Sequence, residues 1–212
     1  AKAAATIAEY FRDQGNHVLL VLDSVTRFAQ AHREIALASG EPGTLAGFPP
    51  STSQEISQLC ERTGPGEEFS GDITAVFSVL VAGSDMEEPV ADMLRGFLDG
   101  HIVLDRSIAE RGRFPAIDVL RSVSRSLPEA AEDDENELIS RTRQTLSVYE
   151  QNEMMIRASL YVPGSNDMID EAIAVWPSLD DFFGSSEPDS VTKSFERMAM
   201  CFHRDSDQTD ET

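Results

Sequence analysis

The sequence predicts an α/β domain built on a parallel sheet, followed by a second domain that is entirely helical. Two apolar runs, residues 17–23 and 73–81, have the length and composition of strands that are buried on both faces of a parallel sheet. Helical patterns lie between them, and beyond residue 128 apolar residues recur only at helical spacing. We therefore expect an α/β domain over 1–128, a helical domain over 129–203, and a disordered tail over 204–212.

The elements of the α/β domain alternate between helix and strand. An opening helix ends near Gly15, and the first strand follows it at once. The remaining elements are a helix through Phe28, His32, Ile35 and Ala36, a loop dense in glycine and proline at 40–50, a short helix with Ile56 and Leu59, the second strand, a helix at 90–98 and a third strand at 101–104. Such βαβ alternation predicts a parallel sheet with helices on both faces.

The second domain begins after an acidic run at 129–137, which is typical of a solvated linker. A long helix then runs until Pro163 and Gly164. Ser165 or Asn166 can cap the next helix, which we expect to end at Pro177. The last helix places four apolar side chains on one face: Val191, Phe195, Met198 and Phe202.

Composition narrows the classes of function. The formal net charge is −21, which argues against non-specific nucleic-acid binding, because that binding requires basic patches. No apolar stretch is long enough to span a bilayer, and no signal peptide is visible. The first residue is Ala1 and the first residues already have a helical pattern, so we interpret the chain as a fragment of a longer protein. Its two cysteines, far apart in sequence, are expected to be reduced thiols.

Asp23 is the first candidate site residue, because it ends the first buried strand. Open α/β sheets bind ligands at the carboxyl ends of their strands. In nucleotide-hydrolysing proteins an aspartate at this position helps to hold Mg²⁺ through the metal's water shell. The alternative is that Asp23 only caps the helix that follows.

Three segments, read in order, strengthen the interpretation of Asp23 as a site residue: residues 22–36, 99–106 and 112–125. They resemble the catalytic subunits of rotary-type ATPases, and most of all the export ATPases of flagella and type III secretion systems. The resemblance runs from the first helix to about Asp181 and includes residues 146–152 and 164–177. It implies a RecA-like nucleotide-binding core, ATP and Mg²⁺ as ligands, and a homohexameric ring with ATP at each subunit interface.

The resemblance also implies roles for four residues. Asp23 matches the Walker B aspartate that orients Mg²⁺-bound water, and Arg125 matches the arginine finger that one subunit extends into its neighbour's nucleotide site. Phe114 matches the aromatic residue that stacks on adenine. Arg27, one turn past Asp23, would either face the phosphate-binding loop or brace Asp23. The structural alternatives are a surface arginine in a serine-rich turn for Arg125 and a core side chain for Phe114.

Two parts of the family's machinery do not occur in these residues, namely the phosphate-cradling G-x-x-x-x-G-K-[ST] loop and the catalytic glutamate. The chain by itself is therefore expected neither to bind ATP tightly nor to hydrolyse it. The loop at 40–50 matches the loop that lines the pore of the ring, or is a plain surface loop. Residues 50–57 depart from the family pattern.

The function that the resemblance implies is ATP hydrolysis that energises protein export through a flagellar type III apparatus. The implied partners are export chaperones, substrates, regulatory subunits and a membrane export gate, with no nucleic acid, and the implied location is cytoplasmic, at the inner face of the membrane.

Three alternatives stay open. The chain could belong to the catalytic subunit of an ion-translocating ATP synthase, which residues 175–177 disfavour. It could belong to a hexameric RNA translocase, which the charge disfavours. It could also come from a truncated, non-catalytic paralogue that acts as a binding module.

Overall fold

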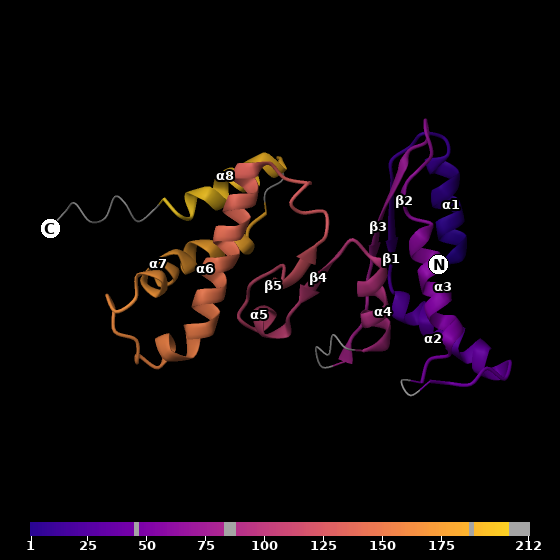
Figure 1. Ribbon diagram of the computed structural model, residues 1–212, viewed down its shortest axis with the longest axis horizontal. Coiled ribbons are helices and arrows are strands. Elements are labelled where there is room, and N and C mark those ends of the chain that lie inside the picture. Colours follow the sequence, from indigo (N-terminus) through magenta and orange to yellow (C-terminus); the bar gives the residue numbers. More distant parts are fainter. Residues whose placement is uncertain (45–46, 83–87, 187–188, 204–212) are drawn as a thin grey trace. The chain divides into compact units, whose positions relative to one another are not determined.

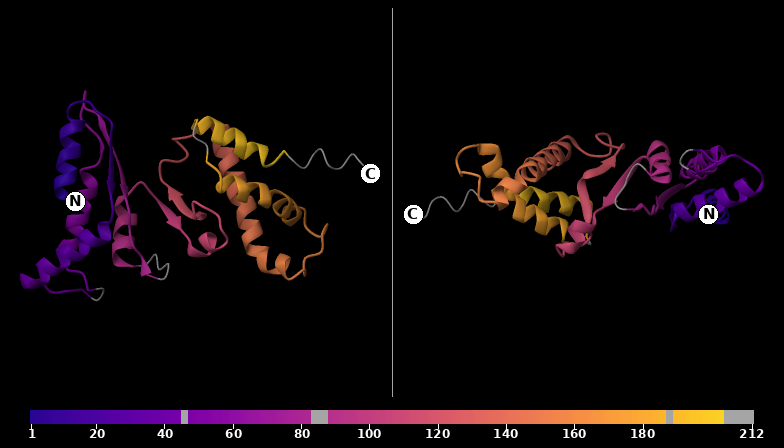
Figure 2. Two further views of the ribbon diagram at one scale, coloured as in Figure 1. Left: turned by 180° about the vertical axis from the view of Figure 1, so that it is seen from behind. Right: turned by 90° about the horizontal axis from the view of Figure 1, so that it is seen from below.

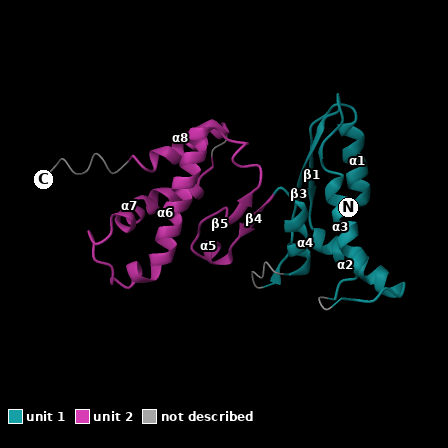
Figure 3. Ribbon diagram, viewed as in Figure 1, with its two compact units in different colours: residues 1–99 teal, residues 100–212 magenta. Residues whose placement is uncertain are grey.

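The computed structural model describes residues 1–44, 47–82, 88–186 and 189–203 (Figure 1). These residues form two compact units, 1–99 and 100–212, each of which is described by itself (Figure 3). The predicted tail at 204–212 and two residues of the predicted pore loop, Leu45 and Ala46, lie outside the described residues. The domain boundary expected near residue 128 stays a prediction.

Over its described residues, the first unit contains a small sheet and four α-helices. In chain order they are α1 (Lys2–Arg12), β1 (Val18–Leu22), α2 (Val25–Ala38), α3 (Pro50–Glu61), β2 (Gly64–Pro65), β3 (Asp72–Phe77) and α4 (Pro89–Phe97). Strand β1 pairs in parallel with β3, from Val18 opposite Ile73 to Leu22 opposite Phe77, and β2 adds an antiparallel edge to β3. The parallel pair confirms the α/β class that the apolar runs predicted.

The helices cover one face of this sheet. Ala5 and Ala8 of α1 pack with Leu20 and Ile73, whose side chains point to the same face. On the opposite face Leu19 and Val21 are 65% and 64% exposed, and Val76 is 53% exposed. The expectation that β1 is buried on both faces is therefore wrong for the described structure. The apolar pattern indicates a face suited to burial, and none of the described elements covers it.

The second unit begins with a short antiparallel pair. It contains β4 (Gly100–Leu104), α5 (Arg106–Glu110), β5 (Ile117–Ser124), α6 (Asp133–Arg157), α7 (Asp167–Phe183) and α8 (Val191–Met200). The third predicted strand, β4, pairs antiparallel with β5 instead of extending the parallel sheet. Parallel neighbours need a long crossover, whereas the single turn and a half of α5 lets β5 fold straight back on β4.

The acidic run forms the start of a helix where a linker was expected. Asp133, Asp134 and Glu135 occupy the first turn of α6, and Glu132 and Glu135 make the two reciprocal hydrogen bonds of a capping box. Carboxylates are stabilised at a helix N-terminus, because the unpaired N–H groups and the helix dipole carry partial positive charge there. The negative charge therefore favours the helix start.

The end of α7 also differs from the prediction. Asn166 caps α7 as predicted, but Pro177 lies inside that helix, which continues to Phe183. A proline in a helix interior costs about 3 kcal/mol. Val175 and Leu179, one on each side of it, are buried with Cys201, and their burial offsets this cost. The views in Figures 1 and 2 agree that α7 and α8 both lie beside α6. Within the described residues, no helix is long and apolar enough to cross a membrane.

Candidate functional site

Asp23 is exposed at the carboxyl end of β1, directly before α2. The N-cap of α2 is the next residue, Ser24, whose side chain accepts a hydrogen bond from the backbone N–H of Arg27 at 3.4 Å. The capping role that Asp23 could have played therefore belongs to Ser24. The peptide bond between Asp23 and Ser24 is cis.

Hydrogen bonds join this tip to the end of β3. The Ser78 hydroxyl donates to Oδ1 of Asp23 at 2.5 Å, which fixes the orientation of the carboxylate. Three further bonds involve the backbone: Ser78 N–H to Leu22 carbonyl at 3.1 Å, Val25 N–H to Ser78 carbonyl at 3.0 Å, and Leu80 N–H to the Thr26 hydroxyl at 2.9 Å. The segment that bears Asp23 is thus held on both sides of the carboxylate.

Sequence reasoning missed Ser78, although a signal was present. Leu22 lies opposite Phe77 in the parallel register, so the next position of each strand brings Asp23 and Ser78 to the same edge. A polar residue that interrupts the second apolar run at this level marks a partner for the aspartate.

Arg27 lies on the exposed side of the first turn of α2. Its guanidinium donates to Oε1 of Gln30 at 3.2 Å, along the same helix. The described contact of this side chain is therefore with Gln30 rather than with Asp23, and it does not support the bracing role.

Phe114 and Arg125 belong to the second unit. Phe114 lies between α5 and β5 and is 64% exposed, so the alternative of a core side chain does not hold. The residue before it anchors the loop: Arg113 donates to the Ile117 carbonyl at 2.9 Å, and its Nε lies 3.4 Å from Oδ1 of Asp180. Burial lowers the pKa of the Arg113 guanidinium. Arg125 is exposed and directly follows the last residue of β5.

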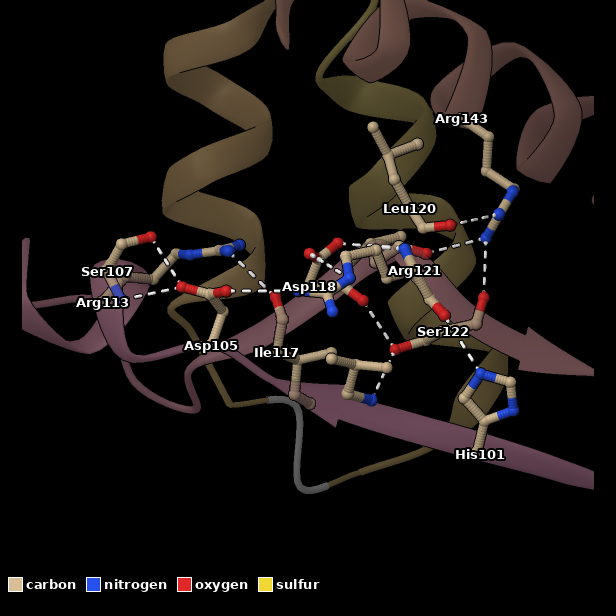
Figure 4. A network of polar contacts seen from close by, with 12 residues as sticks. His101, Asp105, Ser107, Arg113, Ile117, Asp118, Leu120, Arg121, Ser122 and Arg143 are labelled. Carbon is tan, nitrogen blue, oxygen red and sulfur yellow. Dashed lines mark hydrogen bonds and ion pairs between the residues drawn. The ribbon is translucent and has the colours of Figure 1, made fainter. Parts of the chain in front are cut away.

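Strand β5 carries a bulge just before Arg125. Asp118 lies opposite Val103 and Val123 lies opposite His101, so residues 119–122 face Ile102 alone. The Arg143 guanidinium of α6 donates to three carbonyls of this bulge: Val119 at 2.7 Å, Leu120 at 2.9 Å and Ser122 at 3.2 Å. Figure 4 shows Arg143 reaching from its helix to these oxygens.

The other two carbonyls of the segment 118–122 also have donors. Nε2 of His101 lies 3.2 Å from the Arg121 carbonyl oxygen, and the Ser122 hydroxyl donates to the Asp118 carbonyl at 2.6 Å (Figure 4). The bulge therefore has no unsatisfied carbonyl, which gives it one defined conformation. None of this was predicted. The signal that could have revealed it is Arg143 itself, a cation next to Thr142, which interrupts the apolar stripe of the long helix.

Asp105 fixes the other end of the same network. It caps α5, and its Oδ1 accepts from the Ser107 hydroxyl at 2.6 Å and from the Ser107 N–H at 2.7 Å. The Ser107 hydroxyl, then its N–H, holds the pKa of Asp105 below its ordinary value. Arg121, at 3.4 Å from Oδ2, adds a cation beside it.

A cavity of about 480 Å³ lies within the second unit, lined from α5, β5, α6 and α7. Tyr149 and Trp176 stack at its wall, with 4.6 Å between ring centroids. Glu150 also lines it, and burial, followed by the charges of Asp118 and Glu153, raises the pKa of this carboxyl group. Six carboxylate side chains and three arginines share the lining, so negative charge predominates in the cavity.

Two families of known proteins match the chain in succession. Residues 1–124 match the ATP synthase alpha/beta family, nucleotide-binding domain, and residues 131–200 match the T3SS EscN ATPase C-terminal domain. Among curated relatives, the flagellum-specific ATP synthase of Bacillus subtilis is 47% identical and covers 92% of this chain. The SPI-2 type 3 secretion system ATPase of Salmonella typhimurium is 46% identical and covers 87%. The chain spans 44% and 42% of these two proteins, less than half of their length.

Solved structures agree. The assembled ATPase EscN from the enteropathogenic E. coli type III secretion system superposes with a TM-score of 0.89 at 40% identity, over 94% of this chain and 48% of that one. EscN in complex with its central stalk EscO superposes with a TM-score of 0.83 at 40% identity, over 95% of this chain and 49% of that one.

Proposed function

Because the chain belongs to the ATP synthase alpha/beta family, we propose that it is part of an ATPase that energises protein export through a flagellar type III apparatus. One observation carries this proposal: the nucleotide-binding match over residues 1–124 is followed in the same chain by the type III secretion ATPase C-terminal match over 131–200. That succession favours an export ATPase over an ATP synthase subunit.

Asp23 would serve the metal in this enzyme. Its carboxylate is exposed, and Ser78 engages Oδ1, so Oδ2 can accept from a Mg²⁺-bound water. Within the described part of the chain, no three His, Cys, Asp or Glu side chains are placed to hold a metal together. A single carboxylate that acts through water fits an ion whose other ligands are nucleotide phosphates and water. When bound, Mg²⁺ neutralises charge on the β- and γ-phosphates.

Arg125 would act in the neighbouring subunit. An exposed guanidinium at the end of a strand can place several donors on the equatorial oxygens of the transferring phosphoryl group, where negative charge has to be stabilised. Phe114, exposed on its loop, would stack on adenine and read only the flat face of the base. Arg27, exposed one turn past Asp23, would face the phosphates.

The proposal extends to partners. EscN is described as an assembled ATPase and as a complex with a central stalk. By analogy this protein would form a homohexameric ring, bind a stalk subunit, and receive chaperones and export substrates on its helical domain. Its place would be at the cytoplasmic face of the membrane, beside the export gate.

The test uses the full-length protein that contains this chain. It should hydrolyse ATP in a Mg²⁺-dependent manner, and Asp23→Asn should lower turnover by about 100-fold and weaken the Mg²⁺ dependence. Deletion of the gene should block secretion of filament subunits. ATPase activity that requires RNA, or co-purification with an ion-translocating membrane rotor, would contradict the export assignment. Unchanged Mg²⁺ dependence in Asp23→Asn would show that the carboxylate does not serve the metal.

A further inference from the structure

We infer that Arg143 of α6 is a positioning residue for Arg125, because it fixes the bulge of β5 that ends three residues before Arg125. The inference rests on the proposed function, in which Arg125 is the arginine finger. It concerns a residue that does not touch the nucleotide and acts through the backbone.

The geometry requires an arginine. The planar guanidinium donates to the Val119, Leu120 and Ser122 carbonyls at 2.7, 2.9 and 3.2 Å. A guanidinium has five N–H donors in a fixed fork and can bridge three acceptors at once, whereas an ammonium is a compact point charge on a flexible stem. The contact therefore sets the shape of the bulge as well as its stability.

The position of the bulge links it to the finger. Ser122 is the last residue that Arg143 holds, and Val123 and Ser124 resume pairing with His101 and Gly100. Arg125 follows directly, three residues after the clamp. Each residue of extended chain advances about 3.3–3.6 Å, so a shift of the bulge is passed on to the start of the Arg125 side chain within about 10 Å.

Loss of Arg143 would leave those three carbonyls without their donor. The two remaining donors, His101 and the Ser122 hydroxyl, serve the carbonyls of Arg121 and Asp118, so they cannot replace it without giving up their own bonds. A bulge with three unpaired, partly buried carbonyls rearranges to reach water. The finger would then be displaced while the nucleotide's own contacts stay in place.

The experiment compares Arg143→Ala, Arg143→Lys and Arg125→Ala, alone and combined, in the full-length protein. Arg143→Ala should lower kcat for ATP hydrolysis by roughly 10–100-fold and change KM by less than about threefold, because a displacement of about 1 Å affects the transition state more than binding. Arg143→Lys should fall between Arg143→Ala and wild type. Arg157→Ala, which removes an exposed arginine from the same helix, is the matched control and should retain wild-type kcat.

The combined variant separates positioning from simple stability. In the Arg125→Ala background, Arg143→Ala should cause no further loss of kcat in single-turnover measurements, because the finger it positions is gone. If Arg143→Ala lowers kcat equally in the wild-type and Arg125→Ala backgrounds, the inference is overturned. Wild-type turnover in Arg143→Lys would also overturn it, and this variant decides the question if Arg143→Ala does not fold. If instead Arg125→Ala keeps full turnover, it is the proposed finger that fails.

Discussion

The hydroxyl of Ser78 donates a 2.5 Å hydrogen bond to Oδ1 of Asp23, although the two residues lie 55 positions apart in the chain. The parallel register of β1 and β3 brings them to the same edge of the sheet. The bond orients one oxygen of a carboxylate group whose residue is exposed. Ser78 is thus placed to orient a group that would hold Mg²⁺ through water.

Removal of that hydroxyl should weaken the metal site. In the full-length protein, Ser78→Ala is expected to lower Mg²⁺-dependent ATP turnover by about 10-fold or more, because partners that orient a metal-serving carboxylate contribute at that level. Steady-state rates across a Mg²⁺ titration measure it. Thr74→Ala, on the exposed side of the same strand, is the control and should change little. A normal Mg²⁺ titration in Ser78→Ala would contradict the orienting role.

Arg125→Ala should lower turnover by about 1,000-fold or more with little change in nucleotide affinity, as expected of an arginine finger. If the finger acts in the neighbouring subunit, mixing this variant with Asp23→Asn should restore activity above that of either alone. Some interfaces in mixed rings combine an intact Asp23 with an intact Arg125. The absence of any recovery, with mixed rings confirmed by differential tagging, would argue against action between subunits.

Phe114→Ala should raise KM for ATP by about 10-fold, since stacking of a base on an aromatic ring contributes about 1–3 kcal/mol. The rise should be similar for GTP, because stacking does not distinguish hydrogen-bonding edges. Phe114→Tyr should remain near wild type. The matched control is Phe69→Ala, which removes a phenylalanine that is 94% exposed in the other unit. An unchanged KM in Phe114→Ala would remove Phe114 from the nucleotide site.

The ion pair between Glu9 and Arg62 should make stability depend on pH. Arg62 donates to both carboxylate oxygens, at 2.7 and 2.6 Å, and this bonding holds the pKa of Glu9 below its ordinary value of 4.5. The stabilisation is therefore present above pH 4.5 and is lost as the pH falls through the lowered pKa. Glu9→Gln should reduce the free energy of unfolding by about 1 kcal/mol at pH 7 and by progressively less in acid.

Denaturant unfolding of the full-length protein at a series of pH values measures this dependence. Glu34→Gln removes an exposed carboxylate from α2 and should show no such trend. An equal cost of Glu9→Gln at pH 7 and in acid would contradict the assignment.

Local patterns predicted the elements of the fold more completely than their pairing. The apolar runs at β1 and β3 identified a parallel pair, although the described elements cover only one of its faces. They could not reveal that β5 would pair with β4, since β5 mixes polar and apolar residues. The prediction that α7 ends at Pro177 failed, because burial of Val175 and Leu179 outweighs the one hydrogen bond that the proline removes.

The candidate-site residues divide in the same way between local patterns and long-range contacts. Asp23, Phe114 and Arg125 could be singled out because each lies in a segment with a recognisable pattern. Ser78 and Arg143 were missed, because their partners are 55 and 21–24 residues away and a polar residue within an apolar pattern does not by itself identify its partner.

The bonds from Arg143 to β5 join groups that do not change charge in mild acid. A guanidinium keeps its proton throughout the physiological range, and carbonyl oxygens do not titrate. Ion pairs such as that of Glu9 with Arg62 weaken as carboxylates take up protons. Acid below pH 4.5 would therefore loosen the Glu9–Arg62 pair of the first unit while the bonds that hold the β5 bulge persist, so that a loss of turnover there would report on the carboxylates and the nucleotide rather than on a misplaced finger.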